Sequence, residues 1–193
     1  VWTPSDNYIK PQLADQIAIG FFKNFSKGDY SLEVESYYKK IKNRIDYIDG
    51  ADLIANEAIE QIILNGKMRS YGLEVLVRKN SGNFNGWVAY TLSRSEQQTP
   101  GRTPTEIGIN NGDWYRSAYD KTHNLAVTGS YKLNPKWTFG ANFTLQSGQP
   151  VTFPSGKYVF QGVTVPSYNS RNEDRLPAYH RLDISATLTP KRK

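Results

Sequence analysis

The stretch YGLEVLVRKNSGNFNGWVAYTLS, residues 71–93, contains two strand-like runs that are joined by a short polar turn. In the first run apolar side chains alternate with polar or small ones. The apolar positions are Tyr71, Leu73, Val75 and Val77, and the opposite positions are Gly72, Glu74, Leu76 and Arg78. This alternation is typical of an antiparallel strand whose two faces meet different surroundings. It predicts a hairpin with one apolar face and one face that carries ionisable groups.

The same alternation recurs along the whole chain, and the connections between the alternating segments follow a regular order. The segments lie approximately at 15–25, 29–48, 67–80, 84–97, 122–133, 136–147 and 179–190. Short turns at 26–29, 80–83 and 134–136 alternate with long connections at 49–66, 98–121 and 148–178. This order places every short turn at one end of a sheet and every long loop at the other. Within the third long connection, KYVFQGVTV predicts a small external hairpin that turns at Gln161-Gly162.

This sorting of the loops favours a membrane β-barrel, in which short periplasmic turns alternate with long external loops. The Greek-key crossings of a soluble sandwich mix the two kinds of connection. Tyr30 and Tyr38 share the outward face, eight residues apart. That is about 26 Å along a strand, or ~20 Å of height at a tilt of ~40°, near the ~25 Å apolar band of such barrels. We therefore predict an all-β fold, an antiparallel up-and-down meander of about seven strands within a larger transmembrane barrel. A soluble antiparallel sheet with one wet face is the alternative.

Composition excludes several classes of function. The formal net charge is +6, but the basic residues are dispersed and the one dense cluster is Lys191–Lys193, so we expect no nucleic-acid partner. The chain has no cysteine, which excludes disulfides and thiolate metal sites. His123 and His180 have no carboxylate or second histidine at metal-ligand spacing and no base beside a nucleophile. We expect no catalytic site, no metal and no cofactor.

Seven stretches resemble, in order, the barrel of TonB-dependent outer-membrane receptors. They are PQLADQIAIGFFKNF (11–25), VESYYKKIKNRIDYIDGADL (34–53), GKMRSYGLEVLVRK (66–79), GWVAYTLSRSE (86–96), YDKTHNLAVTGSYKLNPKWTFGANF (119–143), SGQPVTFPSG (147–156) and RLPAYHRLDISA (175–186). The resemblance implies a 22-stranded barrel whose lumen holds an N-terminal plug. Residues 1–193 would form a late, partial barrel domain, without the plug, the TonB-contacting box or the last strands.

The resemblance also implies a function and a set of partners. The receptor would lie in the outer membrane of a Gram-negative cell, surrounded by lipid, and would take up a scarce, bulky nutrient. This nutrient could equally be an iron chelate, cobalamin, a glycan or a peptide. Energy would come from the inner membrane through the TonB complex, which acts on the missing N-terminal part. A passive porin or barrel adhesin, and a soluble carbohydrate-binding β-domain, remain open as alternatives.

Two groups of residues are candidates for binding. Aromatic, Arg and Asn side chains of the long loops are typical of binding hot spots, although such loops are polar in any case. These ligand-binding candidates are Trp114, Tyr115, Arg116, Tyr168, Asn169, Arg171 and Asn172. A second group faces the lumen and would contact the plug or water, or pair across strands: Glu33, Glu35, Glu74, Arg78, Arg181 and Asp183.

Overall fold

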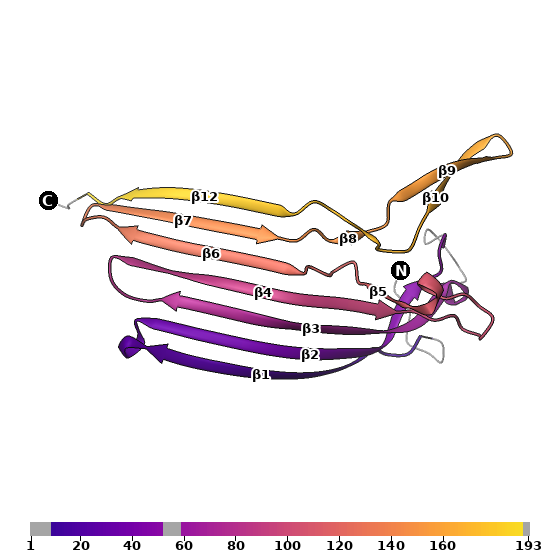
Figure 1. Cartoon of the computed structure of the whole chain (residues 1–193), viewed down its shortest axis with the longest axis horizontal. Coiled ribbons are helices and arrows are strands. Elements are labelled where there is room, and N and C mark those ends of the chain that lie inside the picture. Colours follow the sequence, from indigo (N-terminus) through magenta and orange to yellow (C-terminus); the bar gives the residue numbers. More distant parts are fainter. Residues whose placement is uncertain (1–8, 52–58, 191–193) are drawn as a thin grey trace.

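The computed structural model describes residues 9–51 and 59–190 (Figure 1). The basic cluster at 191–193 and part of the first long connection, residues 52–58, lie outside the described residues.

The described chain is built around one antiparallel meander of long strands. Each strand pairs with the next long strand along the chain, as predicted, because a short turn or a folded-back loop returns the chain beside itself (Figure 1). The order across the sheet is β1 (Leu13–Phe25), β2 (Tyr30–Tyr47), β3 (Ile63–Lys79), β4 (Phe84–Gln98), β6 (His123–Lys132), β7 (Trp137–Gln146) and β12 (Tyr179–Leu188).

Two of the three short turns contain residues with a left-handed backbone. The first is the 3₁₀ segment η1 (Ser26–Gly28), in which φ is +48° at Ser26, +56° at Lys27 and +99° at Gly28. Two further 3₁₀ segments, η2 (Ile59–Gln61) and η3 (Ile109–Gly112), lie in the long connections. Within the described ranges, no helix is long and apolar enough to cross a membrane.

The long connections contain more strand than the sequence predicts. β3 begins at Ile63, four residues before the predicted boundary, because β2 continues to Tyr47 and supplies the backbone partner of Ile63. The short strand β5 (Trp114–Arg116) folds back on the end of β4. β8 (Pro150–Val151) pairs with β11 (Asp174–Arg175). Segments of two or three residues are too short for alternation to reveal them.

The hairpin predicted within the third long connection is confirmed. It consists of β9 (Pro154–Phe160) and β10 (Val163–Tyr168), and it projects beyond the sheet at the end of the long loops (Figure 1). Gln161 and Gly162 form its turn with φ of +49° and +80°, the left-handed pair that a two-residue hairpin turn needs.

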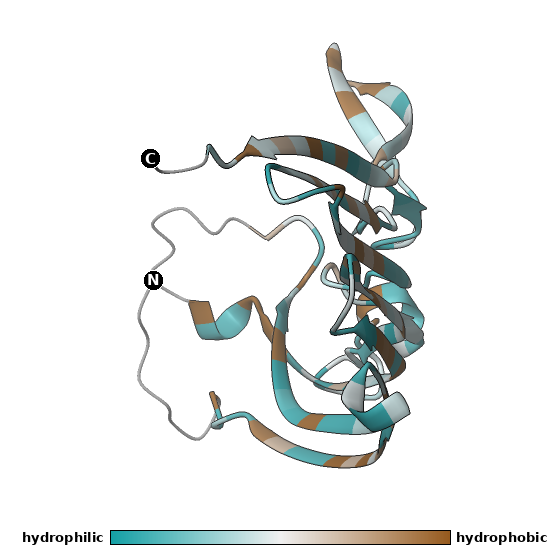
Figure 2. Cartoon of the chain, turned by 90° about the vertical axis from the view of Figure 1, so that its left-hand side faces the viewer, coloured by the Kyte–Doolittle hydropathy of each residue, from teal (hydrophilic) through white to brown (hydrophobic). Residues whose placement is uncertain are grey.

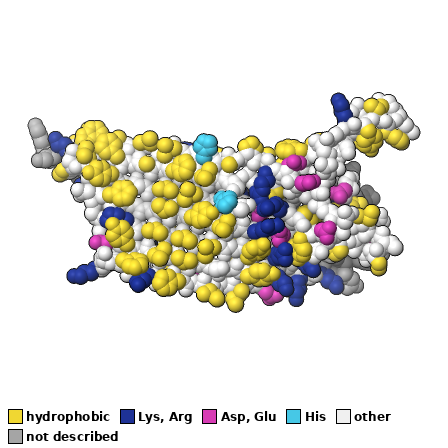
Figure 3. Space-filling model, viewed as in Figure 1, with side chains coloured by type: hydrophobic (Ala, Val, Ile, Leu, Met, Phe, Trp, Pro, Cys, Tyr) yellow, Lys and Arg dark blue, Asp and Glu magenta, His cyan; other side chains and the backbone are white. Residues whose placement is uncertain are grey.

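The sheet is an open arc with one apolar face. Figure 2 shows its curvature end-on, and Figure 3 shows the convex face, where hydrophobic side chains cover most of the sheet. The strand register explains why hydrophobic side chains cover this face, because apolar residues lie opposite each other on successive strands. One such row consists of Val77, Val88, Val127, Phe143 and Leu182. We call this area the apolar band; it runs from Tyr30 and Tyr131, near the short turns, to Tyr38 and Tyr71.

Candidate functional site

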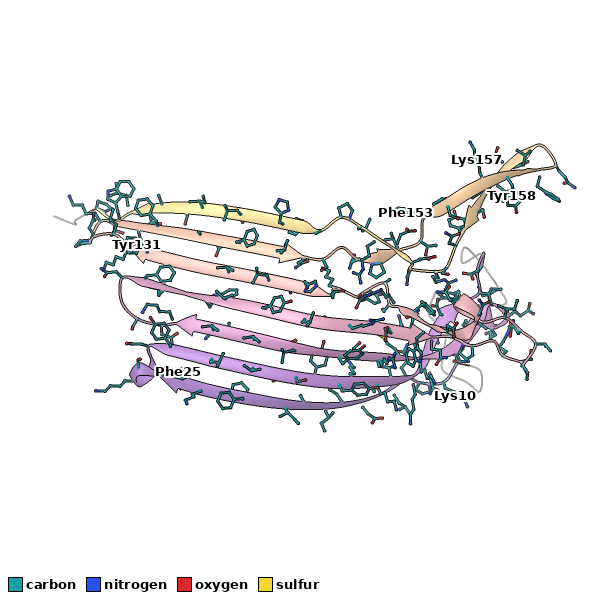
Figure 4. The ribbon with its side chains drawn as sticks, viewed as in Figure 1. Lys10, Phe25, Tyr131, Phe153, Lys157 and Tyr158 are labelled. Carbon is teal, nitrogen blue, oxygen red and sulfur yellow. The ribbon has the colours of Figure 1, made fainter. Side chains whose placement is uncertain are left out.

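The three long connections meet at one end of the sheet, opposite the short turns (Figure 1). We call this end the mouth; it consists of the described residues in 44–66, 96–122 and 147–178. Figure 4 shows the two ends of the molecule: Phe25 and Tyr131 lie near the short turns, while Lys157 and Tyr158 lie on the hairpin of the mouth. The largest fully buried side chains of the described chain are all in the mouth, namely Leu64, Ile109, Thr99, Asp120 and Ser117.

A polar group on the concave side of the mouth joins three separate stretches of the chain. We call Asp46, Gln97, Thr99, Tyr115 and Arg171 the mouth cluster. Asp46 Oδ2 accepts hydrogen bonds from the Tyr115 hydroxyl at 2.7 Å and from Gln97 Nε2 at 2.7 Å. Arg171 Nη1 donates to Asp46 Oδ1 at 2.8 Å. Both carboxylate oxygens are therefore used within the protein, and the third loop is fixed to β2.

The electrostatics of the mouth cluster favour a neutral phenol. Burial raises the pKa of Tyr115 to about 12, and the Asp46 carboxylate, which accepts the hydrogen bond of the hydroxyl, adds to the rise. Burial alone would lower the pKa of Arg171, but Asp46 and Asp49 hold that pKa above its ordinary value. At neutral pH a guanidinium and a phenol thus donate to Asp46 together, which satisfies a partly buried charge.

The second and third loops are also joined directly. Asn110 Oδ1 accepts a hydrogen bond from the Arg171 backbone N–H at 2.7 Å, and its Nδ2 donates to the Arg171 carbonyl at 3.0 Å. Asn172 Nδ2 donates to the Arg116 carbonyl at 2.8 Å. Asn110 and Asn172 have φ of +50° and +57°, a conformation that asparagine tolerates better than most residues.

Asp120 is a second buried centre of charge. Its Oδ1 accepts a hydrogen bond from the Ser95 backbone N–H at 2.7 Å. Its Oδ2 pairs with Arg116 Nη1 at 2.9 Å and with Arg175 Nη2. The carboxylate is fully buried, while the two arginine side chains are 34% and 29% exposed, so the pairs lie at the boundary of the mouth and solvent.

The loop residues predicted to bind a ligand do not share one surface. Tyr115, Arg171 and Asn172 are used in the contacts described above, and Arg116 is held by Asp120. Trp114 lies on the convex side, where the guanidinium of Arg69 stacks on its ring at 4.1 Å. Tyr168 and Asn169 are exposed at the base of the hairpin.

The six residues predicted to face the lumen occupy the concave face by their register. Arg181 pairs with Asp183 at 2.8 Å, along one strand rather than across two. The cross-strand alternative does not occur among the described residues: Glu33, Glu35, Glu74 and Arg78 form no ion pair there. Glu35 lies directly opposite Glu74, and like charges in that position repel.

Neither histidine belongs to a metal-holding group among the described residues. The ring of His123 is bonded through Nδ1 to the Tyr90 hydroxyl at 2.8 Å on the convex face. Across residues 9–51 and 59–190 no group of three His, Asp or Glu side chains is placed to hold a metal ion.

Three residues that organise the mouth are absent from the sequence-based candidates: Asp46, Gln97 and Asp120. Each is an ordinary polar residue near the end of a strand, and apart from the Arg116–Asp120 pair the partners described above lie 18 to 125 residues away in the chain. Their acidic or amide character beside a predicted long loop is the signal that could have suggested them.

Comparisons with known proteins agree with this architecture. The family model of the TonB-dependent receptor-like β-barrel matches residues 2–193. The structure is similar to the crystal structure of the ferripyoverdine receptor of the outer membrane of Pseudomonas aeruginosa bound to ferripyoverdine, with a TM-score of 0.60 and 14% identity. The match covers 92% of this chain and 21% of that receptor, so the likeness concerns the fold of about a fifth of its length. No curated protein sequence matches. With its whole length matched by one family model and its strands in the same arrangement, the chain belongs to the TonB-dependent receptor-like β-barrel family.

Proposed function

We propose that this chain is a wall segment of an outer-membrane transporter that takes up a scarce, bulky nutrient with energy from the TonB complex. The observation that carries the proposal is a sheet of the receptor-barrel family with an apolar convex face and a charged concave face. Such a sheet fits a barrel wall between lipid and a polar lumen. Family membership favours this function over a porin, an adhesin or a soluble carbohydrate-binding domain.

The open edges of the sheet support a larger wall. In the described sheet, β1 pairs only with β2, and β12 pairs only with β7. Unpaired backbone groups are costly in lipid, and closed barrels avoid them. In the proposed receptor, neighbouring strands of the same protein complete both edges. The plug then occupies the lumen and faces the concave side, where Glu33, Glu35 and Glu74 form no ion pair with described residues and supply negative charge for it.

The ligand would be captured at the mouth. Tyr158 and Tyr168 of the hairpin are 55% and 54% exposed, and the exposed Asn169 follows Tyr168 in the chain. Rigid aromatic and amide groups at this position would suit an iron chelate, cobalamin, a glycan or a peptide. The mouth cluster would hold the loops in place behind these contacts. Ferripyoverdine is the ligand of the similar receptor, and at 14% identity it does not select among these classes.

Conductance measurements on the full-length protein that contains this chain would test the transporter against the porin. In a planar bilayer, a plugged receptor should show no steady open channel, and deletion of its plug should produce one. An intact protein with a permanent ohmic pore would contradict the proposal. Uptake of labelled cobalamin and ferric siderophores should be lost when TonB is deleted from the host, and uptake independent of TonB would count against it.

The orientation is testable with single cysteines, because the chain has no competing thiol. Glycines in the turns are poor sites, since Gly28, Gly82 and Gly162 have positive φ and Gly101 has backbone 2.1 Å from an added Cβ. Thr164→Cys on the exposed hairpin should react with an impermeant maleimide on intact cells. Lys136→Cys in a short turn should react only after lysis. The reverse pattern would invert the proposed topology.

A further inference from the structure

The convex face ends at the mouth in a patch of cations. Moving along each strand from the apolar band towards the mouth, aromatic or aliphatic side chains give way to basic ones. Tyr38 is followed on the same face by Lys40 and Lys42, and Tyr71 by Arg69 and Lys67. Figure 3 shows a column of Lys and Arg side chains that bounds the hydrophobic area on this side. We call Lys40, Lys42, Lys67, Arg69 and Arg94 the basic rim.

The register of the basic rim brings like charges together. Lys40 lies directly opposite Arg69, and Lys42 lies opposite Lys67. Paired positions on neighbouring strands are ~5 Å apart, and successive positions on one face are ~7 Å apart. The four cations therefore occupy the corners of a small rectangle. Like charges in cross-strand pairs destabilise a sheet unless another group compensates them.

The protein itself compensates this charge only in part. Two carboxylates occupy strand positions that pair with the rim. Glu96 is buried and pairs with Arg69 at 2.8 Å and with Arg94 at 2.5 Å. Asp15 lies opposite Lys40 in register. Lys40, Lys42 and Lys67 are exposed and form no ion pair within the described residues. An excess of positive charge thus remains on an outward surface.

The surroundings of the rim point to a lipid headgroup. Lys40 is two residues beyond Tyr38, about 7 Å further along the strand, which is the depth of headgroups rather than hydrocarbon. Tyr38 and Tyr71 stack at 6.3 Å immediately below it, and Trp114 lies against Arg69 and Lys67. Tyr and Trp concentrate at membrane interfaces, and clustered Lys and Arg attract anionic headgroups.

On these grounds we propose that the basic rim binds the phosphate groups of a lipid in the external leaflet. The proposal rests on the proposed function, since it requires the convex face to lie in a membrane with the mouth outside. A phosphate has several acceptor oxygens and can bridge Lys40 to Arg69 or Lys42 to Lys67. The bound lipid would neutralise the rim and fix the depth of the wall.

Binding of lipopolysaccharide, a phosphate-bearing lipid, tests the proposal on the full-length receptor purified in detergent and freed of lipid. Each cation near a membrane surface contributes about fivefold to binding of an anionic lipid, so the triple variant Lys40→Gln, Lys42→Gln, Lys67→Gln should bind labelled lipopolysaccharide about 100-fold more weakly. The matched control Lys27→Gln, Lys132→Gln, Lys136→Gln removes three lysines at the short-turn end, and its binding should be unchanged.

Three outcomes would overturn the proposal. Equal losses in both variants would indicate diffuse attraction, and no loss in either would remove the rim as a site. Displacement of lipopolysaccharide by millimolar inorganic phosphate, with no difference between dephosphorylated and intact lipid, would assign the rim to free phosphate. The failure of the proposed function is separate: the plug-dependent conductance described above does not depend on the three lysines.

Discussion

The apolar band and the mouth are made from the same strands, but their side chains are stabilised by different surroundings. Among the described residues of the band, no side chain is buried within the protein, and Ile17, Phe21, Leu73 and Ile184 are exposed on it. In the mouth, Leu64 and Ile109 are buried together with Tyr115, and polar groups are joined across loops. The band thus needs an apolar medium outside the protein, whereas the mouth contains a core of its own.

This difference predicts which substitutions are tolerated where. In the band the face of a residue should decide the outcome, since one face would meet lipid and the other a polar lumen. In the mouth the partners of a residue should decide it, because buried polar groups there are satisfied by named donors. The four predictions that follow substitute residues of the apolar band, the mouth and the concave face, from the largest expected effect to the smallest.

The largest effect is expected on the apolar face. Val127 lies between Val88 and Phe143 in the middle of the band. Val127→Arg should destabilise the full-length receptor by about 2–4 kcal/mol, the cost of a cation at the bilayer midplane, and hinder its assembly. The measurement is urea unfolding in lipid vesicles, with heat-modifiable gel mobility as the assay of assembly.

Thr128→Arg is the matched control, because its side chain belongs to the opposite face. It should assemble normally. Phe139→Arg repeats the apolar-face substitution closer to the short turns, where Phe139 lies opposite Tyr131, and a smaller loss is expected. Asn142→Arg, opposite Thr128 on the other face, should also assemble normally. Equal losses on both faces would refute the assignment of lipid and lumen.

The next effect concerns the buried charge of the mouth. Asp120→Ala removes the partner of both Arg116 and Arg175 and leaves the Ser95 backbone N–H without its acceptor. Breaking a buried pair costs about 3–5 kcal/mol, and we expect about 2–3 kcal/mol because both arginines are partly exposed. Hydrogen exchange of the second and third loops should rise sharply.

Assembly of the band should remain normal in this variant, which separates the two regions. Asp113→Ala is the control, because Asp113 is exposed and its side chain forms no ion pair among the described residues; the exchange of both loops should stay unchanged in it. Failure of Asp120→Ala to insert into membranes would show that the mouth core is needed to form the band, contrary to the comparison.

The sequence predicts the band well and the mouth poorly, for a physical reason. Alternation with period two is a local property, so seven strands, their order and their faces can be read from neighbouring residues. The external hairpin is equally local, since the Gln161-Gly162 turn specifies it. The early start of β3 at Ile63 depends on pairing with Tyr47, which lies across a long loop, and no local pattern contains that information.

The mouth depends on contacts between distant residues, and residue type alone does not identify them. Trp114 and Tyr115 are adjacent, yet strand β5 directs one to the convex rim and the other to the buried cluster. Arg171 is of a residue type common in ligand-binding sites, yet its guanidinium forms ion pairs with Asp46 and Asp49. The sequence therefore locates the region of the site, whereas the roles of its residues require the fold.

A smaller effect is expected from the phenol of the mouth cluster. Tyr115→Phe keeps the ring and removes the donor to Asp46, which still receives Gln97 and Arg171. We expect a loss of about 1–2 kcal/mol in the stability of the mouth, the usual cost of an unmade buried hydrogen bond. Tyr119→Phe, on an exposed tyrosine, should change nothing.

The same substitution gives a pH signature. The folded-state pKa of Tyr115 is raised to about 12 from 10.0, so the neutral phenol is favoured in the folded mouth. Its contribution is fully present below pH 10 and is lost as the pH rises towards 12. Hydrogen exchange of the loops should show this alkaline loss in the parent receptor and a weaker dependence in Tyr115→Phe. An identical alkaline profile in the parent receptor and in Tyr115→Phe would show that another group causes the alkaline loss of stability.

The smallest effect on stability is expected from Arg181 and Asp183 on the concave face of β12. Their side chains are 64% and 49% exposed, and exposed ion pairs contribute little to stability. In a plug-deleted receptor, the double variant Arg181→Ala, Asp183→Ala should unfold at the same urea concentration as the parent. In the complete receptor, the predicted contact with the plug should make the same variant leak in planar bilayers, because a charged anchor of the plug is lost. Thr187→Ala, further along the same face, serves as the control and should not leak. A destabilised plug-free barrel would show that the pair supports the wall itself, and an unchanged conductance would show that these two residues face water.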